Sequence, residues 1–204
     1  MDDMPAFEPV KVKCKDTDCE HDLHCYRPKR WAKDKRTSTC QACGDDGVDW
    51  PLLRGRDLAS VDDIFGQLQR ELIRHVFFTA PLDATARENI RLVGVVAVRA
   101  GVREYLRKKI GPARIFRDGT QTPKKDSVIH FAQHATATCC RKCLDYWYDI
   151  PQGRDLTDAE LTFCEGLVQS YMDTRQKEMN EAEAAGPAAS KPFHGAGTCA
   201  GVEQ

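Results

Sequence analysis

The spacing of apolar residues predicts helices through the middle of the chain. Between residues 60 and 78, apolar side chains recur every three or four positions, which is the period of one helix face. These positions are Ile64, Leu68, Leu72, Ile73 and Val76. Ser60 and Asp63 resemble a capping box, and Pro81 cannot continue the helix, so we predict a helix over residues 60–78.

Two further helices are predicted next. Asp83 is a suitable cap for a short helix that runs to Arg91. The following helix covers residues 95–109 and ends at Gly111. One face of it is apolar, and another face repeats arginine at four-residue steps. These arginines are Arg99, Arg103 and Arg107.

The last third of the chain combines one predicted strand with two helices. Residues 128–132 form a short, apolar and partly β-branched run, which favours a strand. A helix is predicted over residues 139–148. Thr157 and Glu160 match a capping box for a final helix over residues 158–178.

The N-terminal region has a different composition. Residues 11–50 are rich in cysteine, charge and turn formers and poor in aliphatic residues, so they need a staple such as a metal ion. We therefore predict a mostly helical α+β fold. Its parts are a flexible N-terminus (1–10), a zinc-ribbon-like module (11–50), a helical domain with a second Cys/His site (55–178) and a disordered tail (179–204).

Composition and charge narrow the class of protein. Hydrophobic residues make up 41% of the 204 residues, enough for a core, and the net charge of −1 leaves any attraction to polyanions to local patches. The chain has no long apolar run and begins without the pattern of a signal peptide, so we expect a cytoplasmic protein with no membrane partner. Ten cysteines in a reducing compartment are typical of metal ligands or redox groups.

The strongest chemical signal is the run Cys40-Gln-Ala-Cys43-Gly44. Two thiolates three residues apart can bind one metal from a tight turn, and the glycine permits the backbone conformation that the turn needs. The mixture of cysteine and histidine nearby favours zinc over an iron–sulfur cluster. The partners come from Cys14, Cys19, His21, His24 and Cys25, and the spacing leaves open which of them ligate. The favoured ligand set is Cys14, Cys19, Cys25, Cys40 and Cys43.

A second candidate site lies around residues 130–143. Cys140 and Cys143 repeat the two-residue gap, and His134 lies five residues before Cys139. A second zinc ion held by these four residues is the favoured interpretation. The alternatives are a catalytic metal or reactive thiol, a redox switch at Cys140 and Cys143, and inert buried cysteines beside a core histidine.

The same region resembles a known family. The run Gln133-His-Ala-Thr-Ala-Thr-Cys-Cys-Arg-Lys-Cys-Leu-Asp-Tyr-Trp147, followed by Ile150-Pro-Gln-Gly-Arg-Asp-Leu-Thr-Asp-Ala-Glu160, is similar to the signature of a prokaryotic domain-of-unknown-function family. The resemblance is dense over residues 115–175 and implies no established activity. It implies that one constellation is formed by Gln133, His134, Cys139, Cys140, Arg141, Cys143 and Trp147.

Basic residues give the last signal. A basic, aromatic segment joins the two N-terminal cysteine groups, and the helix over residues 95–109 adds its three arginines. Segregated arginine is typical of a surface that contacts DNA or RNA. The predicted nucleic-acid contacts are Arg27, Lys29, Arg30, Trp31, Arg99, Arg103 and Arg107. The alternative is a helix face paired with acids of the 155–183 region.

These signals predict a zinc-binding protein whose role is to bind nucleic acid. The rival prediction is a metal- or thiol-dependent enzyme of hydrolase or nuclease type. Its candidate catalytic residues are His134, Cys140 and Arg141, with the histidine as base and the arginine holding an anion. His75 and Cys164 are expected to be core residues without a chemical role.

Overall fold

The predicted mostly helical fold is confirmed. The computed structural model describes residues 8–28, 39–116 and 122–185, and within these ranges the only extended pairings are two isolated bridges, Asp18 with Leu23 and His24 with Glu71. The elements are η1 (Cys19–His21), α1 (Trp50–Gly55), η2 (Leu58–Ser60), α2 (Val61–Gln69), α3 (Leu72–Thr79), α4 (Ala84–Val93), α5 (Val95–Lys109), α6 (Val128–Ala135), α7 (Arg141–Tyr148), α8 (Asp158–Thr174) and α9 (Gln176–Ala184). The strands of a zinc ribbon are therefore not formed by the described residues.

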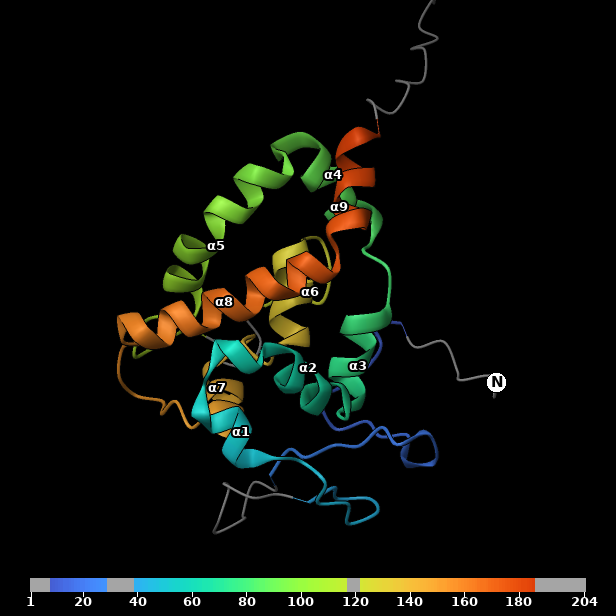
Figure 1. Cartoon of the computed structure of the whole chain (residues 1–204), viewed down its shortest axis with the longest axis vertical. Coiled ribbons are helices and arrows are strands. Elements are labelled where there is room, and N and C mark those ends of the chain that lie inside the picture. The colour runs from blue at the N-terminus through green and yellow to red at the C-terminus, as the bar shows by residue number, and fades with distance from the viewer. Residues whose placement is uncertain (1–7, 29–38, 117–121, 186–204) are drawn as a thin grey trace, which may run out of the picture.

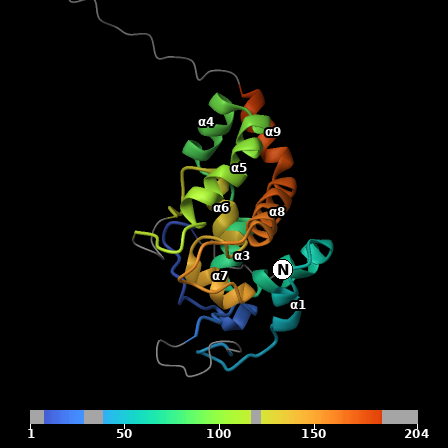
Figure 2. The ribbon, with the colours of Figure 1, turned by 90° about the vertical axis from the view of Figure 1, so that its left-hand side faces the viewer.

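The described helices group at two opposite ends of the molecule. In Figures 1 and 2, α4, α5 and α9 gather at one end, and α1, α7 and the cysteine-bearing N-terminal segments gather at the other. Helix α8 packs along α5, and α6 packs against both α3 and α8 between the two ends. None of the described helices is long and apolar enough to cross a lipid bilayer.

The single helix predicted over residues 60–78 is broken into α2 and α3. Glu71 is extended, with φ −89° and ψ 124°, and the backbone groups freed on either side of it pair with His24. The N–H of His24 donates to the carbonyl of Arg70 (2.8 Å), and the N–H of Leu72 donates to the carbonyl of His24 (3.0 Å). The apolar period could not reveal this break, because the partner lies 47 residues earlier in the chain. Ser60 precedes α2 but makes no capping hydrogen bond.

The predicted strand over residues 128–132 is wrong, because these residues begin helix α6. The Ser127 side chain caps the helix by accepting from the N–H of Ile129 (3.2 Å). Helix α6 lies between α3 and α8 with all of its residues except His130 buried, so its apolar side chains are not confined to one exposed-versus-buried face. A continuous apolar run of this length does not distinguish a strand from a buried helix.

The C-terminal helix is also divided. The predicted capping box of Thr157 and Glu160 is present and begins α8. At the far end, the Arg175 guanidinium donates to the carbonyls of Phe78 (2.6 Å) and Ala80 (2.9 Å), and α9 then continues to Ala184. The disorder predicted from residue 179 is therefore wrong for residues 179–184, and the rest of that predicted tail lies almost wholly outside the described residues.

The N-terminal segment shares the core of the helices. Tyr26 is fully buried, and its ring meets the edges of Trp50 and Trp147, with centroids 6.4 Å away in each case. Val12 and Leu23 are buried in the same cluster. The apolar contacts of residues 8–28 are thus made with the helices, because this segment has too few aliphatic residues to enclose them itself.

The Glu160 carboxylate should link stability to pH. The pKa of Glu160 is lowered from 4.5 to about 2. The largest cause is the hydrogen bonding of Arg154 to the carboxylate (2.7 Å), and the N–H of Thr157 (2.9 Å) lowers the pKa further, whereas burial raises it. A lowered carboxylate pKa stabilises the fold above the unfolded value, and this stability is lost as the pH falls toward 2. We expect Glu160→Gln to reduce the free energy of unfolding by about 1–3 kcal/mol at pH 7.

Urea denaturation at pH 7 and at pH 2.5 checks this prediction. The difference in the free energy of unfolding between wild type and Glu160→Gln should be smaller at pH 2.5 than at pH 7. Glu8→Gln, at an exposed ion pair with Lys11, should show almost no difference at either pH. An equal loss for Glu160→Gln at both pH values would contradict the assignment.

Candidate metal centres

Two clusters, one of cysteines with a histidine and one of cysteines alone, come together in the structure, and both are geometrically suitable for a metal ion. The first, which we call the N-terminal centre, brings four ligand atoms within 4.8 Å of one another. Its residues are Cys19, His24, Cys40 and Cys43. The Sγ atoms of Cys19 and Cys40 are 3.8 Å apart, and the Sγ of Cys43 is 3.3 Å from the Nδ1 of His24. Side chains from three separate segments of the N-terminal region therefore surround one point.

The turn that carries Cys40 and Cys43 has the conformation that the sequence predicts. Gly44 has a φ of +84°, which is readily adopted by glycine, and its N–H donates to the carbonyl of Cys40 (2.9 Å). The pKa of the Cys40 thiol is lowered to about 6. Burial is the largest single influence and raises the pKa, but hydrogen bonds from several backbone N–H groups, chiefly those of Cys25 and Cys43, outweigh it. Cys40 is therefore a thiolate at neutral pH, which is the form that binds metals.

The His24 ring is held in place by carboxylates on its other side. Its Nε2 lies 2.8 Å from the Asp22 carboxylate and 3.8 Å from that of Asp45, and only 3% of the residue is exposed. Asp45 is in turn held by Arg70 (3.1 Å) and by the hydroxyl of Tyr26. A proton on Nε2 leaves the Nδ1 lone pair facing the sulfurs, as a metal-binding histidine requires.

The structure resolves which of the five N-terminal candidates approach Cys40 and Cys43. Cys19 and His24 do, whereas Cys14 and Cys25 lie outside the four, and His21 bonds to Asp18 (2.8 Å). Because His24 is paired with Glu71 in extended backbone, neighbouring side chains point to opposite sides, and the Cys25 thiol faces away. Its Sγ donates to the carbonyl of Cys14 (3.1 Å). Sequence spacing alone favoured Cys14 and Cys25 because it carries no information about these directions.

The second cluster, which we call the cysteine triad, consists of Cys139, Cys140 and Cys143. Their sulfur atoms lie within 4.8 Å of one another, and those of Cys139 and Cys143 are 3.5 Å apart. Cys140 is the N-cap of α7, so the triad straddles the start of that helix. Cys139 and Cys140 are buried.

A buried arginine from α3 reaches this triad. Arg74 is 2% exposed, and its guanidinium lies 3.8 Å from the sulfur of Cys139 and 3.4 Å from that of Cys143. It also donates to the Glu71 carboxylate (2.9 Å) and to the carbonyl of His134 (2.6 Å). The pKa of Cys139 lies well below its ordinary value. Hydrogen bonds with Cys140 and Cys143 are the largest cause, and the charge of Arg74 also lowers it. Sequence reasoning missed Arg74, although an arginine within the apolar run of residues 72–78 is the signal that could have found it.

His134 and Arg141 lie near the triad but serve the fold. The His134 ring stacks on Phe77 at 4.7 Å, and its Nε2 lies 3.1 Å from the carbonyl of Thr122. Burial first, and then the charge of Arg74, lower the pKa of His134 to about 4, so the ring is neutral. The Arg141 guanidinium donates to the carbonyls of Ile110 (3.1 Å), Gly111 and Pro151 (2.7 Å), which ties three loops together. The anion-binding role expected for Arg141 is therefore not supported by its contacts.

The other members of the predicted constellation also hold backbone in place. The Gln133 amide donates to the carbonyl of Thr138 (3.0 Å) and accepts from the Thr122 hydroxyl (3.3 Å). Trp147 is fully buried. Gln133 thus fixes the loop between α6 and α7, which positions the cysteine triad, and Trp147 is part of the core.

The arginines predicted to contact nucleic acid are engaged within the chain. Arg99 bonds to Asp173 (2.8 Å) and Gln176 (2.7 Å), Arg103 bonds to Glu165 (2.8 Å), and Arg107 bonds to Glu104. Two of the three therefore join α5 to the acidic face of α8 and α9, which is the alternative that the sequence left open. Arg27 lies at the edge of the described residues, and Lys29, Arg30 and Trp31 lie outside them.

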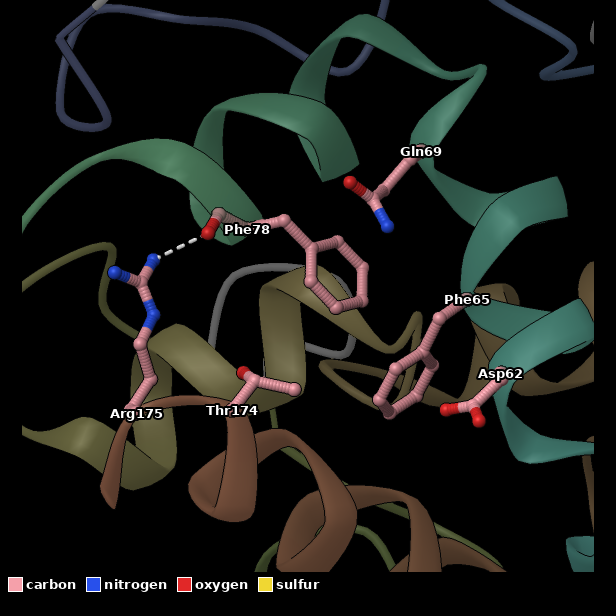
Figure 3. A pocket seen from close by; sticks show the side chains of 6 residues that line it. All are labelled: Asp62, Phe65, Gln69, Phe78, Thr174 and Arg175. Atoms are coloured by element: carbon pink, nitrogen blue, oxygen red, sulfur yellow. Dashed lines mark hydrogen bonds between the residues drawn. The ribbon is translucent and has the colours of Figure 1, made fainter. Parts of the chain in front are cut away.

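A shallow hollow of about 340 Å³ lies between α2, α3 and the end of α8 (Figure 3). Its lining residues are Asp62, Phe65, Gln69, Phe78, Thr174 and Arg175. The guanidinium of Arg175 and the hydroxyl of Thr174 are already bonded to backbone carbonyls (2.6 Å and 2.7 Å). The hollow contains no residue of either metal cluster, so we assign it no chemical role.

Comparison with known proteins gives the chain a family. No solved structure matches the chain. A family described as "Domain of unknown function (DUF4186)" matches residues 62–173, which is more than half of the chain. The matched part runs through nearly all of α2 to α8 and contains Arg74 and the cysteine triad, whereas the N-terminal centre lies before it. With this match, the chain belongs to the DUF4186 family.

Proposed function

We propose that this protein is a zinc-binding protein in which two ions act as structural staples. One ion is held by the N-terminal centre and the other by a site built on the cysteine triad. The observation that carries this proposal is the convergence of four ligand atoms within 4.8 Å at the N-terminal centre. Four protein ligands close a tetrahedral site and leave no position for a substrate, which favours a structural role over a catalytic one.

The ligand types and spacing favour zinc. Three cysteines and one histidine form a common structural zinc set, and soft thiolates discriminate against calcium and magnesium. A tetrahedral ion with metal–sulfur bonds of about 2.3 Å has sulfur atoms about 3.8 Å apart. The distance between the sulfurs of Cys19 and Cys40 is 3.8 Å.

An ion at the N-terminal centre would fix the N-terminal segment to the helices. His24 is both a candidate ligand and the backbone partner of Arg70 and Leu72 at the break between α2 and α3. Binding there would link the turn of Cys40 and Cys43 to this break. The segment has few aliphatic residues, so the ion would add to the contacts that Val12, Leu23 and Tyr26 make with the helices.

The contacts of the α5 arginines do not favour the predicted binding of nucleic acid. The prediction rested on the basic, aromatic segment that joins the two N-terminal cysteine groups and on the arginines of α5. Arg99 and Arg103 are bonded to α8 and α9 instead, and Lys29, Arg30 and Trp31 lie outside the described residues. The enzyme alternative required His134 to act as a base for a thiol. The His134 ring is stacked in the core, its Nε2 lies at a backbone carbonyl, and its buried Nδ1 has no hydrogen-bond partner among the described residues, so no thiol is bonded to it. We therefore confine the proposed function to structural zinc binding.

Removal of one ligand should remove one ion. We expect the purified wild-type protein to contain two zinc ions per chain, one for each cluster, and Cys43→Ser to contain one. The lost site should lower the melting temperature by at least about 6 °C, because about 3 kcal/mol or more of stability is lost in a chain of this size. Elemental analysis and thermal unfolding measure both effects.

The matched control is Cys164→Ser. Cys164 is a buried cysteine of α8 outside both clusters, so this variant should keep two ions even if it is less stable. A wild-type protein that is free of zinc and keeps its melting temperature in a strong chelator would refute the proposed function.

The Asp22 carboxylate, which orients His24, should affect the zinc affinity of the N-terminal centre without changing its number of ligands. Asp22→Asn keeps a side chain that tolerates the positive φ of this position (58°) but removes the charge beside Nε2. We expect zinc affinity at the N-terminal centre to fall about 10- to 100-fold. Competition with a chromophoric chelator measures it, and Asp18→Asn, beside the non-ligand His21, should bind like wild type. Equal affinities for the two variants would contradict the assigned orientation of His24.

A further inference from the structure

A continuous series of contacts joins the two clusters, and it runs through the break between α2 and α3. At one end, the Nδ1 of His24 lies 3.3 Å from the Sγ of Cys43 in the N-terminal centre. The backbone of His24 pairs with the break, because its N–H donates to the carbonyl of Arg70 (2.8 Å) and its carbonyl accepts from the N–H of Leu72 (3.0 Å). His24 therefore belongs to the first cluster by its side chain and to the break by its backbone.

Side chains continue this series from the break to the cysteine triad. The Glu71 carboxylate accepts from Arg74 at 2.9 Å, in a buried pair with 2–3% of each side chain exposed. The guanidinium of Arg74 lies 3.4 Å from the Sγ of Cys143 and 3.8 Å from that of Cys139. Direct contacts thus link the two clusters at every step.

One step of this series is able to open and close. The pairing of His24 with Glu71 is an isolated bridge, and two hydrogen bonds of this kind are weak by themselves. When the bridge is closed, Glu71 is extended at the start of α3, with φ −89° and ψ 124°, and its carboxylate meets Arg74. An ion at the N-terminal centre would hold the His24 side chain and so favour the closed bridge.

The closed bridge in turn favours an ion at the triad. Three thiolates and one Zn²⁺ carry a charge of −1, and a guanidinium that donates to two of the sulfurs offsets it. The Glu71 carboxylate holds Arg74 in the position from which it does so. The carbonyl of His134 also accepts from Arg74 (2.6 Å), but it carries no net charge.

We infer that the two centres bind their ions cooperatively, with the His24 bridge and the Glu71–Arg74 pair carrying the effect of one ion to the other. This inference rests on the proposed function, which assigns one zinc ion to each cluster. Coupling between two binding equilibria is reciprocal, so each ion raises the affinity of the other centre by the same factor. We expect a factor of at least about five.

Competition for Zn²⁺ between the full-length protein and a chromophoric chelator measures this factor. Cys143→Ser leaves the N-terminal centre and Cys43→Ser leaves the triad, so each variant gives the affinity of one centre while the other is empty. Wild type gives two successive affinities. Their product should exceed the product of the two single-centre affinities by at least about fivefold. This comparison holds whichever centre fills first.

Two background substitutions distinguish the proposed route from a general effect of stability. Glu71→Gln keeps the backbone bridge but removes the charge that holds Arg74, so the factor should fall toward one. Glu160→Gln is the matched control, because it removes a buried carboxylate that lies outside the series of contacts. The factor should stay at its wild-type value in that background. Circular dichroism of the metal-free forms establishes that each variant is folded.

The outcomes separate this inference from the proposed function. Two ions in wild type with equal products of affinities would mean independent centres, which overturns the inference and leaves the proposed function in place. A factor that is unchanged in Glu71→Gln, or that rises equally in Glu71→Gln and Glu160→Gln, would overturn it too, because the coupling would then not pass through Arg74. If wild type binds one ion or none, the two-ion function fails and the inference fails with it.

Discussion

The backbone pairing of His24 with the break between α2 and α3 is the constraint on which the two clusters depend. It satisfies the backbone groups left free where α2 stops, and it fixes the N-terminal segment in an extended conformation against the helices. Extended backbone sends successive side chains to opposite sides. His24 therefore faces the N-terminal centre, while Cys25 faces the side of Glu71 and Cys14.

The same break places the charge that the cysteine triad needs. Arg74 lies three residues after Glu71, at the start of α3, and from there its guanidinium reaches two sulfurs and a carboxylate. A buried arginine without such partners would cost several kcal/mol. A thiolate at Cys139 and the charge of Arg74 thus stabilise one another, and metal binding at the triad would use the same balance.

Charge in the rest of the molecule is used inside the fold. The arginines of α5 join that helix to α8 and α9, and Arg141 and Arg175 bind backbone carbonyls at loop and helix ends. A planar guanidinium with five N–H donors suits both tasks. The arginines of α5, together with Arg141 and Arg175, are therefore used to hold helices and loops together.

The sequence by itself determined the local features. The period of apolar residues located the helix at residues 95–109 and most of the helix predicted over 158–178, which ends at Thr174, and the capping box at Thr157 formed as predicted. The turn at Cys40, Cys43 and Gly44 and the gathering of Cys139, Cys140 and Cys143 also follow from short spacings. Such features are local, because their partners lie within a few residues.

Tertiary structure alone decided which distant residues meet. It broke the helix at Glu71, made a helix of the apolar run at residues 128–132, and chose His24 over Cys14 and Cys25 at the N-terminal centre. It also brought Arg74 to the triad and paired Arg99 with α8 and α9. Each of these outcomes depends on a partner far along the chain and on the direction of a side chain, and neither is encoded in the spacing of nearby residues.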